Sequence, residues 1–349
     1  MRNAYCAICV AEELPVGALI GFLLVVVVGV LPMIAYALIL WWLDRYEKEP
    51  LALLIAAFLW GAVPAAVFSL IAEVALGVPI SHFVKPAAAD MIGGAVVAPL
   101  VEELFKGSAL FLLLLLFRQE IDSPLDGIIY GGLVGFGFAA VENVGYFAGE
   151  FMASGAGGVL TLAVIRAFLF GLNHALFTGL TGLGLAMMRT APSPAVRVGA
   201  PIAGLGLGIA AHSIHNGSVM LGAELCWPCL IAFASDWGGV FMLLGVTIWT
   251  SLQEQRWITD FLVDEVELGT LSREDYNVIR SHIGRIAARA NALSNGDLKQ
   301  WRLLGRYHRL ATELAFNKRR LAHFPSEEQT QALVVRLREQ VRAMGDDQG

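Results

Sequence analysis

Two adjacent glutamates and a lysine lie inside an otherwise apolar part of the chain. The segment PLVEELFKGS occupies residues 99–108, and the apolar run LFLLLLLF follows at residues 110–117. A charged side chain at the centre of a membrane span costs at least ~2.5–3.5 kcal/mol, so residues of this kind usually serve a function. Glu102, Glu103 and Lys106 are therefore the first candidates for chemistry.

Three later apolar stretches also contain polar side chains. These residues are Glu142, Asn143, Arg166, Asn173, His174, His212, His215 and Asn216. Glu102 and Lys106 are four residues apart, as are His212 and Asn216, and side chains at this spacing share one face of a helix. The sequence thus predicts four consecutive helices that each present polar groups toward a common interior.

This set of side chains fits the activation of a water molecule. A carboxylate shielded from solvent, such as Glu102, can act as a general base, and His174 can orient the water. His212 and Asn216 offer donors for the oxyanion of a tetrahedral intermediate. We therefore favour a hydrolase.

Two other uses of the same residues remain open. A catalytic zinc ion takes three protein ligands and a water, and the candidates are Glu102, Glu142, His174 and His212. The chain lacks the HExxH spacing of zinc proteases. The alternative function is a proton- or ion-coupled transporter with the buried Glu and His residues as a relay. Transporters usually show internal repeats, and residues 16–117 and 125–222 show none.

The composition divides the chain into two parts. It is 57% hydrophobic and 15% charged, whereas soluble proteins carry roughly 25% charged residues. Residues 1–251 hold 9 of the 24 Lys and Arg and 16 of the 30 Asp and Glu, and the last 98 residues hold the others. We expect a membrane part followed by a small soluble helical tail at residues 252–349. The net charge of −6 indicates no nucleic-acid partner.

The hydropathy pattern predicts an all-α fold, a polytopic bundle of about seven transmembrane helices, with eight as the alternative count. Each span needs ~20 apolar residues. The expected spans are 16–43, 51–77, 90–117, 125–149, 158–188, 200–222 and 229–251.

The basic residues in the short loops predict the orientation. Three loops at 44–50, 118–123 and 189–197 carry five Lys or Arg residues, and the loops on the other side carry one, Lys85. Because basic loops stay in the cytoplasm, we expect an extracytoplasmic N-terminus and a cytoplasmic tail.

The four cysteines form two CxxC pairs at predicted extracytoplasmic ends. They are Cys6, Cys9, Cys226 and Cys229. A structural disulfide is favoured in an oxidising compartment, and a zinc site is the alternative.

The tail shows amphipathic helical periodicity. Ser272 is a predicted N-cap with Asp275 three residues later, and further helices are expected after residues 295–297 and 325–326. The three histidines of the tail show no spacing typical of a site, so we expect a regulatory or scaffolding role.

Four motifs on successive spans resemble those of one protein family. EELFK (102–106), FAAVEN (138–143), FGLNH (170–174) and HSIHN (212–216) are similar, in this order, to the EExxK, FxxxEN, FxxxH and HxxxN motifs of the PrsW family of intramembrane proteases. The loop DRYEKEP also looks like that family. This resemblance covers roughly residues 30–250.

The resemblance implies a membrane peptidase domain at residues 1–251 in a prokaryotic plasma membrane. Its substrates would be membrane-anchored proteins such as anti-sigma factors. It implies that Glu102 is the general base with His174 as its partner. The remaining implied site residues are Glu103, which pairs with Lys106, Glu142 of the second motif, and His212 and Asn216 at the oxyanion.

Overall fold

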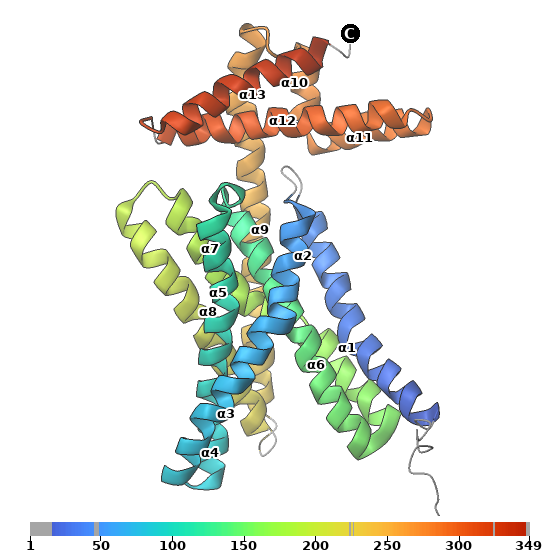
Figure 1. Ribbon diagram of the computed structural model, residues 1–349, viewed down its shortest axis with the longest axis vertical. Coiled ribbons are helices and arrows are strands. Elements are labelled where there is room, and N and C mark those ends of the chain that lie inside the picture. The colour runs from blue at the N-terminus through green and yellow to red at the C-terminus, as the bar shows by residue number, and fades with distance from the viewer. Residues whose placement is uncertain (1–15, 45–48, 223–224, 226, 324, 347–349) are drawn as a thin grey trace, which may run out of the picture.

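The computed structural model describes residues 16–44, 49–222, 225, 227–323 and 325–346, and it contains no strand among them. The predicted all-α fold is confirmed. The membrane-side elements are α1 (Val16–Leu43), α2 (Leu51–Trp60), η1 (Gly61–Ala65), α3 (Ala66–Phe83), α4 (Pro86–Ile92), η2 (Gly93–Val97), α5 (Ala98–Leu116), η3 (Arg118–Glu120), α6 (Pro124–Ala163), η4 (Val164–Leu169), α7 (Asn173–Thr190), α8 (Pro194–Gly222) and α9 (Pro228–Glu267). They form the long bundle in the lower part of Figure 1.

Five stretches of the described chain are long and apolar enough to cross a membrane. They are Leu19–Leu43, Leu51–Phe83, Pro124–Thr190, Pro194–Gly222 and Pro228–Glu267. The stretch at residues 124–190 contains two of the predicted spans. The predicted span at 90–117 corresponds to α4, η2 and α5, which carry the buried charges. A polytopic membrane helix bundle is therefore confirmed.

Helix α6 lies at the centre of the bundle and packs against α1, α2 and α7. Its side toward α7 carries glycines at every fourth position, Gly127, Gly131 and Gly135. A methyl group at any of them would collide with a main-chain carbonyl of α7. The contacted carbonyls are those of Gly182, Thr178 and His174. Small residues thus let the two backbones approach closely, and this contact sets the position of His174.

The start of α6 is fixed by its local sequence. Ser123 Oγ accepts a hydrogen bond from Leu125 N at 3.1 Å, and Asp126 Oδ2 accepts one from Ser123 N at 2.7 Å. Pro124 occupies the first helical position. This reciprocal arrangement satisfies main-chain donors that a helix start leaves open. It defines where α6 begins and hence the register of the glycines on its α7 side.

Helix α9 continues without a break from the membrane part into the C-terminal part. Four further helices follow: α10 (Arg273–Ile279), α11 (His282–Ser294), α12 (Leu298–His323) and α13 (Glu328–Asp346). Helices α10, α12 and α13 pack around the end of α9, and α11 packs on α10 and α12. Ser272 accepts a hydrogen bond from Asp275 N at 2.9 Å, which confirms the predicted N-cap. Figure 1 shows α11, α12 and α13 lying crosswise over one end of the bundle.

The C-terminal helices share an apolar core and a buried ion-pair network. Ile258 and Leu262 of α9 pack with residues of α10, α12 and α13. The fully buried Glu265 accepts hydrogen bonds from Lys318 Nζ at 2.7 Å and from Arg338 Nη2 at 2.7 Å. A buried carboxylate that has two cationic partners joins α9, α12 and α13 rigidly.

The predicted cysteine pairs fall mainly on parts of the chain outside the described residues. Cys6, Cys9 and Cys226 belong to those parts, and Cys229 is exposed at the start of α9. The disulfide and zinc alternatives therefore stay predictions.

The close contact between α6 and α7 predicts an asymmetric effect of added methyl groups. Gly135→Ala should lower the stability of the bundle by about 1–3 kcal/mol, because overpacking forces the two backbones apart. Gly145→Ala on the same helix has open space around the new methyl and serves as the control. Thermal unfolding in detergent should show a lower transition for Gly135→Ala alone. Equal transitions would contradict this account.

A buried histidine predicts acid sensitivity of the C-terminal part. Burial, together with the nearby Arg285 and Arg289, lowers the pKa of His308 from 6.5 to about 4. The unfolded chain therefore binds a proton that the folded chain does not bind between these two values. Stability should fall by on the order of 2 kcal/mol as the pH drops through this window. Calorimetric unfolding at neutral pH and at about pH 4.5 measures this loss. It should shrink in His308→Gln, and an unchanged loss would refute the assignment.

Candidate active site within the membrane helices

Helix α5 places three charged side chains in the interior of the bundle. Glu103 and Lys106 are fully buried, and Glu102 is 6% exposed. Lys106 Nζ lies 2.9 Å from Glu102 Oε2 and 2.9 Å from Glu103 Oε1. Charge-assisted hydrogen bonds of this length offset the cost of burying each charge. The structure therefore brings the first predicted motif together as one ion-pair network.

Two histidines complete the cluster. His174 of α7 and His212 of α8 each offer a nitrogen within 4.8 Å of a carboxylate oxygen of Glu102 and Glu103. His212 Nδ1 is 3.0 Å from Glu103 Oε1, and its Nε2 is 3.9 Å from Glu102 Oε2. Both rings are almost fully buried. Three of the four motif-bearing helices, α5, α7 and α8, thus bring polar side chains together in one cluster.

The contacts of His174 define which ring nitrogen carries the proton. Lys106 Nζ lies 3.1 Å from His174 Nδ1. An ammonium group can only donate, so Nδ1 accepts this hydrogen bond. The proton then resides on Nε2, which lies 2.8 Å from Glu142 Oε2. Glu142 consequently orients the imidazole from the side opposite Lys106.

Glu142 is itself held by neighbouring side chains. Arg166 Nη2 donates to Glu142 Oε2 at 2.9 Å, and Arg166 Nε donates to Asn143 Oδ1 at 3.1 Å. The guanidinium also lies 3.7 Å from the centre of the Tyr146 ring. These contacts join α6 to the π-helical turn η4. They give Arg166, whose role the sequence leaves open, a defined position beside Glu142.

Asn216 points to a different part of the bundle. Its side-chain amide donates to Gly94 O at 2.9 Å, in the π-helical turn η2 that precedes α5. Among the described residues, no hydrogen bond joins this side chain to the Glu and His cluster. In this structure Asn216 therefore connects α8 to the helix that carries Glu102.

His215 belongs to a second buried group. Its Nδ1 lies 2.6 Å from Asp236 Oδ2 of α9, and its Nε2 lies 3.3 Å from Asn173 Nδ2. Asn173 Oδ1 also accepts from His174 N at 2.7 Å. This group of His215, Asp236 and Asn173 thus holds the start of α7 in position through hydrogen bonds from α8 and α9. Asp236 is not among the residues predicted from the sequence, although it too is a charged residue in an apolar span, the signal that identified Glu102.

Two residues of α7 complete the surroundings of the cluster. Thr178 Oγ1 donates to Glu103 Oε2 at 2.9 Å. The Phe177 ring stacks on His212, with 4.7 Å between ring centres. Thr178 follows His174 by four residues, so helical spacing predicts that the two side chains share one face of α7.

The cluster fits zinc by the type of its donors. Two carboxylates and two imidazoles are common zinc ligands. The grouped residues are Glu102, Glu103, His174 and His212, so Glu103 takes the place that the sequence analysis gave to Glu142. The Lys106 ammonium lies within 3.1 Å of a possible metal-ligand atom on three of these four residues, namely Glu102, Glu103 and His174.

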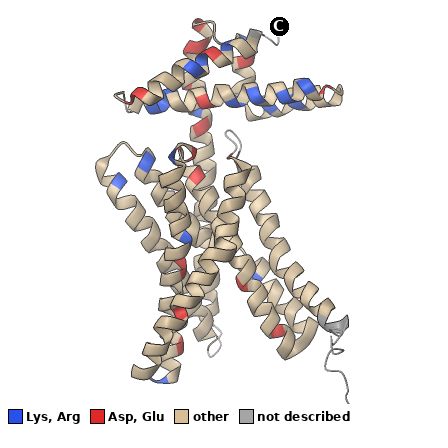
Figure 2. Cartoon of the chain, in the orientation of Figure 1, with Lys and Arg blue, Asp and Glu red and all other residues tan. Residues whose placement is uncertain are grey.

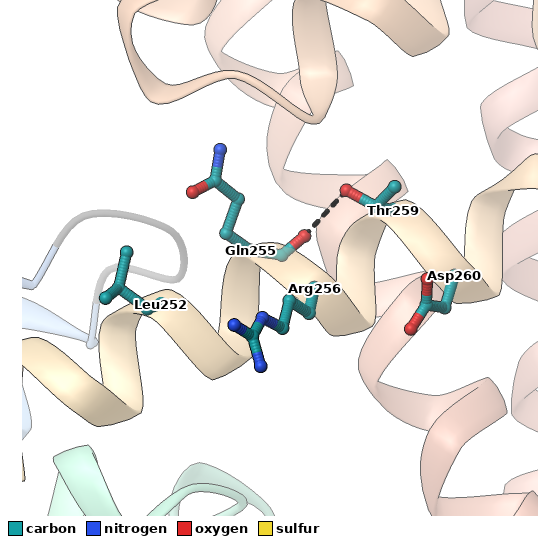
Figure 3. A pocket seen from close by; sticks show the side chains of 5 residues that line it. All are labelled: Leu252, Gln255, Arg256, Thr259 and Asp260. Atoms are coloured by element: carbon teal, nitrogen blue, oxygen red, sulfur yellow. Dashed lines mark hydrogen bonds between the residues drawn. The ribbon is translucent and has the colours of Figure 1, made fainter.

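A shallow hollow on α9 lies outside this cluster. Figure 3 shows its lining and the hydrogen bond from Thr259 Oγ1 to Gln255 O, 2.8 Å long. The lining residues are Leu252, Gln255, Arg256, Thr259 and Asp260. All of them come from one helix, and none belongs to the predicted site.

Comparisons with known proteins agree with the motif resemblance. A family model described as PrsW family intramembrane metalloprotease matches residues 49–251. The chain is also similar to a Protease PrsW of Geobacillus kaustophilus (strain HTA426), with 33% identity over 154 residues. That match covers 44% of this chain and 62% of the relative, which is less than two thirds of its length. No solved structure matches the chain.

The hydrogen bond from Thr178 predicts a difference between two similar substitutions. Thr178→Val should destabilise the protein by about 1–3 kcal/mol, because Glu103 loses a donor in a buried site. Thr181→Val, one turn along α7, removes a buried hydroxyl that has no hydrogen-bond partner. It should be neutral or slightly stabilising. Thermal unfolding in detergent compares the two, and an equal loss of stability would disprove the assigned role of Thr178.

Proposed function

Since the chain belongs to the PrsW family of intramembrane metalloproteases, we propose that it is an endopeptidase that hydrolyses peptide bonds of membrane-anchored proteins. The observation that carries this proposal is the buried cluster of two carboxylates, two imidazoles and an ammonium group on α5, α7 and α8. Anti-sigma-factor-like proteins are the proposed substrate class.

Glu102 is the proposed general base. Its Oε2 accepts from Lys106, and among the described residues no hydrogen bond to its Oε1 is found. Oε1 can therefore take a proton from a water molecule as that water attacks the substrate carbonyl. The same carboxyl group then passes the proton to the leaving amine, which completes hydrolysis of the peptide bond.

His174 is the proposed partner of Glu102. Lys106 contacts Glu102, Glu103 and His174 together and fixes the distance between base and imidazole. Glu142 holds the other side of the ring. A ring held from both sides loses little orientational freedom when substrate binds, which lowers the barrier to reaction.

His212 is the proposed oxyanion donor. Its Nδ1 donates a hydrogen bond to the Glu103 carboxylate. Nε2 can donate to an oxyanion only when it also carries a proton, so this role requires the doubly protonated imidazolium. The resemblance assigns Asn216 to the same role. Its side-chain amide would first have to break its hydrogen bond to Gly94 O before it could bind an oxyanion. We therefore give Asn216 the role of positioning η2 and α5.

A zinc ion would be held by Glu102, Glu103, His174 and His212, and it would polarise the substrate carbonyl and acidify a water molecule. Because Lys106 already supplies a positive charge to three of these residues, we favour the glutamic type of peptidase over the metallo type.

We also propose a plasma-membrane location with the C-terminal helices in the cytoplasm. Arg189 donates to Ile121 O at the end of the bundle from which α9 continues. Lys85 lies at the start of α4. The short loops at the end of the bundle from which α9 continues carry the excess of basic residues, which favours a cytoplasmic position for this end.

The proposal predicts the effect of one carboxylate substitution. Glu102→Gln should lower cleavage by about 10²–10⁴-fold, because an amide cannot accept the proton of water. The assay follows fragments of tagged, single-span membrane proteins in detergent. Glu150→Gln, on α6 and partly buried, controls for the loss of a charge in the bundle and should retain activity.

The same assay with a chelator tests the catalytic type. Cleavage that survives chelation supports the glutamic mechanism, and loss that zinc restores would support the metallo mechanism instead. If no substrate is cleaved, proton flux in sealed vesicles that disappears in Glu102→Gln would favour the transporter.

A further inference from the structure

We propose that α11 and α12 form a lipid-binding surface that docks on the anionic headgroups of the protein's own membrane. The residues concerned lie at 280–312 and are called the basic hairpin here. This segment contains seven Lys or Arg residues and one acidic residue, Asp297. The preceding segment, 252–279, contains two basic and seven acidic residues. The tail is thus nearly neutral as a whole but carries its positive charge in one arm.

Helix α11 presents an apolar stripe to the outside. Ile283, Ile286 and Leu293 are 78%, 54% and 51% exposed, and Leu298 at the start of α12 is 56% exposed. With the exposed Ala290, the positions 283, 286, 290 and 293 follow helical spacing and share one face. A soluble helix seldom exposes such a stripe without a partner.

The opposite face of α11 is the one that packs on α12. Arg285 Nη1 donates to Thr312 Oγ1 at 3.0 Å, and Arg289 lies 4.5 Å from the centre of the Trp301 ring. The apolar stripe therefore points away from α12, and the hairpin itself cannot cover it.

The same hairpin also carries exposed basic residues. They are Arg280, Lys299, Arg302, Arg306 and Arg309. The four on α12 recur at helical spacing. Arg309 interacts electrostatically with Glu313 one turn along the helix, and no ion pair joins Lys299, Arg302 or Arg306 to a described acidic residue. An apolar stripe combined with exposed cations is typical of helices that lie in the headgroup region of a membrane.

The position of the hairpin favours lipid over another occupant. The unbroken helix α9 holds it close to the end of the bundle. Figure 1 shows α11 and the start of α12 extending sideways past the upper ends of α1 and α2. In a membrane, lipid would lie beside these helices. Figure 2 shows the basic residues along this arm. Since the tether keeps the arm next to the bilayer, a weakly binding helix is sufficient.

Hydrogen exchange of the full chain in nanodiscs tests the proposal. One set contains phosphatidylcholine alone, and the other contains phosphatidylcholine mixed with phosphatidylglycerol. Amide exchange in residues 282–294 should be several-fold slower in the anionic discs, and added salt should reduce the difference. The paired variants are Ile286→Glu on α11 and Val335→Glu on α13, which is 51% exposed in the same tail.

Loss of the protection in Ile286→Glu and its retention in Val335→Glu would support docking on lipid. Equal exchange in both lipid compositions would overturn the proposal, as would an equal effect of the two variants. Protection that depends on protein concentration but not on lipid charge would also overturn it, in favour of a second copy of the chain. Peptidase activity is not part of this readout, so the result is independent of the proposed function.

Discussion

The burial of three charges on α5 is the constraint on which the rest of the bundle depends. Glu103 and Lys106 are fully buried and Glu102 is 6% exposed, so other protein groups must compensate most of their charge. Lys106 bonds both carboxylates. The pair of negative charges still exceeds the single positive one, so the fully buried Glu103 needs further donors. Thr178 of α7 and His212 of α8 approach Glu103 for this reason.

Close helix packing makes this compensation geometrically feasible. The donors to Glu103 come from α7 and α8, so both helices must approach α5. The glycines of α6 let α7 lie against its backbone, and Gly184 and Gly204 do the same for α7 and α8. Because these contacts involve main-chain atoms, they define the depth and rotation of α7 more tightly than larger side chains would. In the proposed peptidase, a cluster held in this way would be ordered before substrate binds.

The unbroken helix α9 links the membrane bundle to the C-terminal helices. Its buried Asp236 supports His215 behind the site, and its Glu265 joins the C-terminal core. The two residues lie on one rigid rod of 40 residues. The orientation of the basic hairpin relative to the bundle is therefore set by the same helix that packs behind the cluster. A membrane surface that holds the hairpin would also steady α9.

The sequence by itself determined the helical fold, the apolar spans, and most members of the cluster. These follow from local properties: the run of apolar residues, the cost of charge in hydrocarbon, and helical spacing along one face. Only the tertiary structure decided the partners. It placed Glu103 rather than Glu142 among the four grouped donors, directed Asn216 to Gly94, and paired His215 with Asp236. Such pairings depend on how far each helix is rotated and how deep it sits beside its neighbours, and spacing within one helix does not contain that information.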